Sequence, residues 1–134
     1  MAGFVIIPAL LIGIIISLVE IFFVHQDEAG MGWFKHAIHT LPFMFLFIFV
    51  SMNLDWALGL IGITNNPIYT IIARVIIGII AFIKIRAAAA LVGGTGVGEK
   101  AIHTLIVALL VVIAPYIWDY LLAGIAKQYL PWLK

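Results

Sequence analysis

The chain has 134 residues, of which 66% are hydrophobic and 10% are charged, and its formal net charge is +1. Soluble domains carry roughly 25% charged residues, so most of the outer surface here must face lipid or other apolar protein. The low net charge argues against a free-standing nucleic-acid-binding protein. The absence of cysteine excludes disulfides and thiolate metal sites.

Four apolar stretches follow one another along the chain, at about 3–24, 34–60, 67–92 and 99–126. Each is long enough to cross the hydrocarbon core of a bilayer as a helix. Helices are expected rather than strands, because backbone groups in an apolar medium must form their hydrogen bonds within their own segment. The sequence therefore predicts an all-α protein.

Proline and glycine residues punctuate these stretches. We expect Asn66 to cap a helix whose first residue is Pro67. Pro42 and Pro115 fall inside the second and fourth stretches and are expected to bend them. Glycines near residue 30 and within 93–98 predict a tight turn inside each pair of helices.

The sequence also contains an internal repeat. Residues 30–41 read GMGWFKHAIHTL, and residues 94–105 read GTGVGEKAIHTL. A repeat of this kind indicates a duplicated structural unit. We predict two tandem-duplicated helical hairpins, residues 1–64 and 65–134, which form one integrated domain: a four-helix bundle with a pseudo-two-fold axis along the bundle.

Two histidines occupy equivalent positions in the repeat, His39 and His103. Histidines on symmetry-related helices could ligate one haem axially. The alternative is structural, with AIHTL as a packing motif at the start of a helix. The prediction is that the protein has no cofactor and no metal site, with haem as the competing hypothesis.

Glu20 and Lys84 are also repeat equivalents, and they carry opposite charges. Across a pseudo-two-fold axis they could form an internal ion pair, because an unpaired charge in hydrocarbon is costly. Alternatively, Glu20, Lys84 and Arg86 lie near helix ends and extend their charged groups to water. A third equivalent pair, Asp55 and Asp119, each followed by an aromatic residue, is typical of anchors at a membrane interface.

With its two hairpins, the AIHTL repeat, no cysteine and almost no charge, the chain resembles the highly hydrophobic major coat proteins of spindle-shaped archaeal viruses. The resemblance implies a virion subunit that assembles with copies of itself into a deformable helical shell around double-stranded DNA. It also implies that basic residues near one end of the bundle face the DNA through non-specific backbone contacts; the candidates are Lys35, Lys84, Arg86 and Lys100.

The alternative is a small integral membrane protein with four spans, an accessory subunit of a membrane complex or a small carrier, whose partner is lipid. The basic residues near the hairpin turns then favour a cytoplasmic location for those turns. No nucleophile with its base is recognisable, so an enzyme is not expected. The apolar composition fits both hypotheses, because lipid and neighbouring copies require the same side chains.

Overall fold

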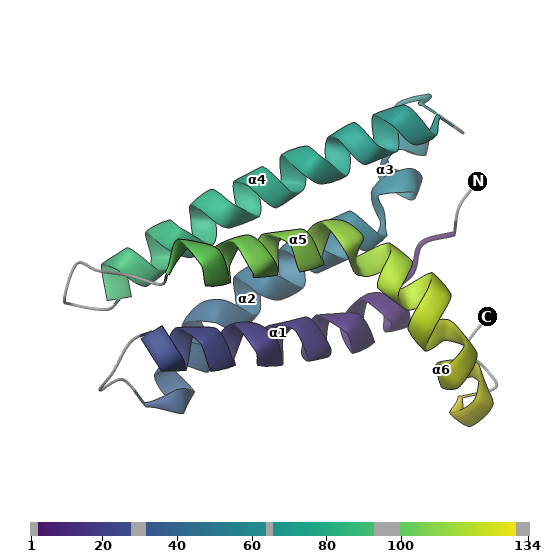
Figure 1. Cartoon of the computed structure of the whole chain (residues 1–134). Helices are drawn as coiled ribbons and strands as arrows, with labels where there is room; N and C mark the ends of the chain where they lie inside the picture. The colour runs from purple at the N-terminus through teal and green to yellow at the C-terminus, as the bar shows by residue number, and fades with distance from the viewer. Residues whose placement is uncertain (1–2, 28–31, 64–65, 93–99, 131–134) are drawn as a thin grey trace.

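The computed structural model describes residues 3–27, 32–63, 66–92 and 100–130, without the side chains of residues 36, 39 and 88–92 (Figure 1). The described residues form helices and no strand, so the predicted all-α class is confirmed. The elements are α1 (Ile7–Asp27), α2 (Trp33–Met52), α3 (Leu54–Leu60), α4 (Pro67–Val92), α5 (Ala101–Ile117), a π-helical segment (Trp118–Leu122) and α6 (Ala123–Tyr129).

The four long helices pack as two antiparallel pairs, α1 with α2 and α4 with α5. Helices α2 and α5 contact each other, while α1 and α4 lie on opposite sides of them (Figure 1). Both chain termini lie at one end of the bundle, which we call the termini end, and the opposite end is the hairpin-turn end. The tandem duplication itself stays a prediction from the sequence.

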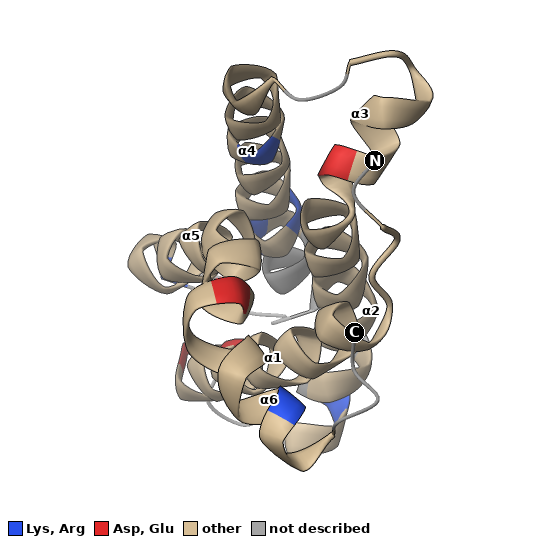
Figure 2. Cartoon of the chain, turned by 90° about the vertical axis from the view of Figure 1, so that its right-hand side faces the viewer, with Lys and Arg blue, Asp and Glu red and all other residues tan. Residues whose placement is uncertain are grey.

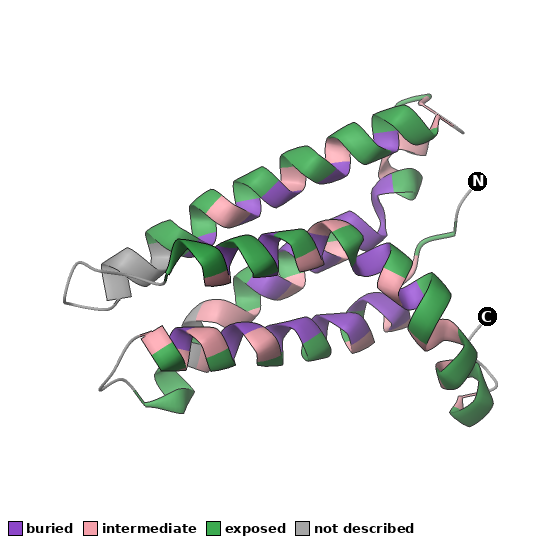
Figure 3. Cartoon of the chain, viewed as in Figure 1, coloured by how far each residue is buried: buried purple, intermediate pink, exposed green. Residues whose placement is uncertain are grey.

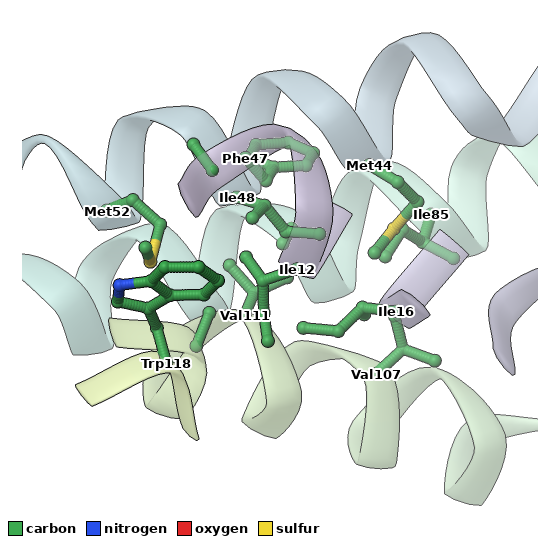
Figure 4. Close-up of a cluster of buried hydrophobic side chains, with 13 residues drawn as sticks. Ile12, Ile16, Met44, Phe47, Ile48, Met52, Ile85, Val107, Val111 and Trp118 are labelled. Carbon is green, nitrogen blue, oxygen red and sulfur yellow. The ribbon is translucent and has the colours of Figure 1, made fainter. Parts of the chain in front are cut away.

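A dry aliphatic core holds the two pairs together. Ile12 and Ile16 of α1, Met44 and Ile48 of α2, and Val107 and Val111 of α5 are all at most 2% exposed (Figure 4). Burying each such side chain contributes about 1.5–3 kcal/mol. The buried residues follow one stripe of each helix, and the opposite stripes are exposed although they are equally apolar (Figure 3).

The second apolar stretch is not the single helix that its composition suggests, because Asn53 interrupts it. Asn53 has φ −104° and ψ 14° and separates α2 from α3. Its side chain accepts a hydrogen bond from Val5 N (2.7 Å) and donates to Val5 O (3.0 Å) and to Phe49 O (2.9 Å). The prediction of one continuous helix over 34–60 is therefore wrong. The break lies at Asn53, which is hydrogen-bonded to Val5, 48 residues earlier in the sequence.

The fourth stretch bends where proline was expected to act. Pro115 has no N–H to donate to the carbonyl group of Val111, one turn earlier. Ser51 Oγ of α2 donates a hydrogen bond to Val111 O at 2.7 Å instead. Three residues after Pro115 the helix widens into the π-helical segment, and α6 leaves the axis of α5 (Figure 1). Prolines and π-helical turns are established causes of helix kinks.

The start of the third stretch matches its prediction. Helix α4 begins at Pro67, and the side chain of Asn66 accepts hydrogen bonds from the N–H groups of Ile68 (3.1 Å) and Tyr69 (3.5 Å). Asn66 is thus the N-cap that the sequence indicates. The glycine turns predicted near residue 30 and within 93–98 lie outside the described residues, apart from Gly32.

Candidate functional site: polar clusters at the ends of an apolar bundle

Charged residues are few, as Figure 2 shows for the described part of the chain. The larger polar cluster, at the termini end, centres on Arg74 of α4, which is only 6% exposed. Its guanidinium group binds Asp55 Oδ2 of α3 at 2.8 Å and donates to Tyr116 Oη of α5 at 3.2 Å and to Ser51 O of α2 at 3.5 Å. Thr70 Oγ1 donates to the other carboxylate oxygen of Asp55 at 2.7 Å. One cation therefore joins four helices, as a guanidinium group with five donors can.

Arg74 also contacts the aromatic face of Tyr116, whose ring centroid lies 5.3 Å from the guanidinium carbon. A cation over an aromatic ring gains about 0.5–2 kcal/mol, depending on its exposure to water. Asp55, the counter-ion, keeps 47% of its side chain exposed. The pair is thus half-buried: the cation is enclosed and the carboxylate reaches water.

The second polar cluster, at the hairpin-turn end, centres on Asp27, the last residue of α1. Its carboxylate accepts a hydrogen bond from the backbone N–H of Lys100 at 2.9 Å and lies 3.2 Å from Lys100 Nζ and 2.6 Å from His103 Nδ1. Lys100 is the N-cap residue of α5. A carboxylate at a helix N-terminus is favourable because the terminal N–H groups carry partial positive charge. Asp27 thereby joins the first helix pair to the second.

His103 is held from two sides. Its ring stacks on Phe23 of α1, with centroids 4.3 Å apart and planes 9° apart, while Asp27 binds Nδ1. Since a carboxylate only accepts, Nδ1 carries the hydrogen and Nε2 is the basic nitrogen of the neutral ring. The side chain of His103 is 15% exposed and that of Asp27 is 1% exposed.

A group of buried polar side chains lies beside this cluster. Ser17, Glu20 and Thr104 have no exposed surface. Ser17 and Glu20 lie on the inner stripe of α1, and Thr104 follows His103 in α5. Thr104 Oγ1 is within 3.4 Å of Lys100 O, whereas Ser17 Oγ has no hydrogen-bond partner within the described part of the chain.

The residues predicted from the sequence are only partly brought together. His103 belongs to the Asp27 cluster, while the side chain of His39 lies outside the described residues, so shared haem ligation stays an untested competing hypothesis. Glu20 is fully buried on α1 and Lys84 is exposed on α4, on opposite sides of the central helices. The ion pairs found among described residues are those of Arg74 and of Asp27, and the Glu20–Lys84 pair stays a prediction.

The basic residues singled out as DNA-facing candidates share one location. All four are exposed and lie near the hairpin-turn end, on α2, α4 and the start of α5: Lys35, Lys84, Arg86 and Lys100. Arg86 also lies over the ring of Phe82, 5.7 Å from its centroid.

Sequence reasoning missed the Arg74 cluster. The sequence pattern predicts only an interface anchor at Asp55 and gives it no cationic partner. The available signal was that an arginine within an apolar helix requires a partner, and that Asp55 and Asp119 are the acidic residues of that end.

No family model, no curated protein and no solved structure matches this chain. The fold and the two clusters define an all-α protein with four helices long and apolar enough to cross a membrane: Ile7–Asp27, Trp33–Met52, Pro67–Ala87 and Ala101–Tyr129.

Proposed function

We propose that the chain is a small integral membrane protein whose four long helices span a bilayer. The observation that carries this proposal is an apolar outer belt bounded at both ends by polar and aromatic side chains. Between Lys35 and Asp55 no residue is Lys, Arg, Asp or Glu; at ~1.5 Å per residue that stretch rises about 30 Å. On α4, the outward apolar run from Ile68 to Ile83 rises about 22 Å at the same spacing. These lengths are close to the hydrocarbon thickness of about 30 Å.

The tryptophans and tyrosines support the same interpretation. Trp33 is exposed at the hairpin-turn end. At the termini end the exposed members are Trp56, Tyr69, Tyr116, Tyr120 and Tyr129, with exposures from 37% to 82%. Exposed large hydrophobic side chains in the middle of the helices are instead Ile, Leu, Val and Phe. Trp and Tyr are enriched at membrane–water interfaces, and the group at the termini end, with Trp33 at the other end, fits that distribution.

The orientation follows from the exposed cations. Four of them lie near the hairpin-turn end; at the termini end Lys127 of α6 is exposed, whereas Arg74 is buried against Asp55. Because Lys and Arg are enriched on the cytoplasmic side, we propose that the hairpin turns face the cytoplasm and both termini face the opposite side.

The role assigned here is that of a subunit or carrier rather than an enzyme. Arg74, Asp55, Ser51 and Asp27 form hydrogen bonds that join one helix to another. Polar groups engaged in this way stabilise a bundle, and the outer faces are left to lipid or to a membrane partner.

A coat protein stays the second candidate, and one observation favours it. Ile72, Ile76, Ile79 and Ile83 are all exposed on α4, at 50–57%, and they follow the alternating spacing of four and three residues that forms a helix–helix seam. A neighbouring copy could pack on this seam, with the exposed cations at one end of the bundle turned toward DNA.

Membrane flotation of cells that express the full chain separates the two candidates. We expect the protein to float with lipid, to resist alkaline extraction and to be released by detergent as discrete particles. Recovery of lipid-free polymers would refute the membrane proposal and support the coat protein.

A further inference from the structure

Glu20 is an ionisable group enclosed by the protein itself. It lies two turns before the end of α1, and none of its surface is exposed. Because α1 packs against α2 and α5 of the same chain, this burial is the same whether lipid or another copy surrounds the bundle. An ionisable residue inside a membrane-spanning bundle is by default a functional-site hypothesis, and ion pathways and proton relays are among the roles of such residues. The side chains around Glu20 decide between them.

Two residues that follow Glu20 on α1, Phe23 and Asp27, hold His103. Phe23 is three residues after Glu20 and Asp27 is seven residues after it, so their Cβ atoms share one side of the helix at successive turns, about 5–6 Å apart for the first pair. The ring of His103 stacks on Phe23 at 4.3 Å and binds Asp27 through Nδ1 at 2.6 Å. His103 therefore covers the turn of α1 that follows Glu20.

A second feature marks this part of the interior as a binding site. Ser17, three residues before Glu20 on the same buried stripe, has a fully buried hydroxyl group with no partner among the described residues. A buried hydroxyl group is normally hydrogen-bonded. Next to Glu20 it can donate to a carboxylate or accept from a carboxylic acid, so it can serve both protonation states.

We propose that Glu20 is a proton-binding site inside the bundle and that His103, oriented by Asp27, passes protons between Glu20 and water at the hairpin-turn end. His103 takes a proton from water at Nε2 and becomes an imidazolium ion beside the Asp27 carboxylate. It then releases that proton from the same nitrogen to the Glu20 carboxylate, which becomes a neutral carboxylic acid. Release follows the reverse order.

This inference goes beyond the proposed function, since it holds in lipid and in a coat alike. The other titratable groups on the elements packed around Glu20 are His25 on α1, Lys100 at the start of α5, and Lys35, His36 and His39 on α2. Lys35 and Lys100 are exposed, and the side chains of His36 and His39 lie outside the described residues.

Infrared difference spectroscopy at varied pH tests the site on the purified full chain. The sequence has three glutamates, Glu20, Glu28 and Glu99, so Glu28→Gln/Glu99→Gln leaves Glu20 as the only one that isotope-labelled glutamate reports. Between about pH 4 and about pH 9, a range that brackets the ordinary carboxyl and imidazole pKa values, we expect a label-shifted carboxylic acid band to appear and disappear reversibly. No label-sensitive change over this range would overturn the proposal.

Variants separate the binding group from the relay. Glu20→Gln should remove the band, whereas Asp119→Asn, an exposed residue at the termini end, should leave it unchanged. His103→Asn keeps an N–H for Asp27 but cannot titrate; it should keep the band and slow its response to a pH jump about tenfold or more, the scale of a lost proton-transfer group. An unchanged response would refute the relay. If Glu20→Gln does not fold, the labelled chain with Glu20 intact still tests the proposal, because its label-shifted carboxylic acid band either responds to pH or does not.

Discussion

The half-buried ion pair of Arg74 and Asp55 makes an asymmetric prediction about stability. Asp55→Asn leaves a buried cation without its counter-charge, whereas Arg74→Met removes the buried charge itself and keeps most of the apolar stem. We therefore expect Asp55→Asn to be the more harmful change, although Asp55 is the more exposed residue of the two.

The magnitudes follow from exposure. Breaking a fully buried pair by removing one partner costs roughly 3–5 kcal/mol. The Asp55 side chain is 47% exposed, so water screens part of this interaction, and we expect Asp55→Asn to cost about 2 kcal/mol after this discount. Arg74→Met loses hydrogen bonds worth about 0.5–1.5 kcal/mol each but no longer buries a charge, so we expect a cost of about 1 kcal/mol.

Reversible unfolding in mixed micelles, followed by circular dichroism, measures both variants and their combination. The double variant should be about as stable as Arg74→Met alone, which gives a coupling energy of about 2 kcal/mol. The exposed Asp119→Asn serves as control and should stay within about 0.5 kcal/mol of wild type. A larger loss for Arg74→Met than for Asp55→Asn, or additive effects, would refute the assignment of Arg74 as a buried cation that depends on Asp55.

Two further predictions concern the packing of α4 against α5 and the carbonyl group of Val111 that Pro115 leaves without a backbone donor. Unfolding in the same micelles measures both. A Cβ atom at Gly78 would clash with the side chain of Val112 on α5, so Gly78→Ala should cost about 1–3 kcal/mol. Gly124→Ala, with open space around it, should be neutral or stabilise by up to about 1 kcal/mol. Equal effects would contradict the close approach of α4 and α5. Ser51→Ala leaves the carbonyl group of Val111 without its donor and should cost about 1–3 kcal/mol. Adding Pro115→Ala, which restores the backbone N–H, should recover much of that loss, and no recovery would contradict the role given to Ser51.

The long helices could be predicted from the sequence because length and hydropathy are local properties. The N-cap at Asn66 and the bend at Pro115 could be predicted for the same reason, since both depend on local residue preferences. The break at Asn53 was not, because it coincides with a pair of hydrogen bonds to Val5, which lies 48 residues earlier in the sequence but beside Asn53 in the fold. Asparagine is neutral to unfavourable inside a helix and favoured at caps and turns, but this local preference alone does not locate a break, and here the tertiary contact with Val5 accompanies it.

In the polar clusters, too, the sequence identified residues but not their tertiary partners. Sequence equivalence directed attention to His39 with His103 and to Glu20 with Lys84. The structure instead joins His103 to Asp27, although Asp27 has no acidic counterpart in the other half of the sequence. Internal symmetry identifies residues that share a backbone position, but hydrogen bonds between side chains depend on which helices meet at one level.

The outward face of α4 offers the most direct test of the membrane assignment. The chain has no cysteine, so single cysteines at the exposed positions Ile72, Ile76 and Ile79 can each carry a spin label without other changes. The full chain reconstituted into bilayers is then probed with oxygen, which concentrates in lipid, and with a water-soluble nickel complex. We predict high accessibility to oxygen and low accessibility to nickel at all three positions. Low accessibility to both reagents would show that protein covers this face, and high accessibility to nickel would show that water does; either result would contradict the account.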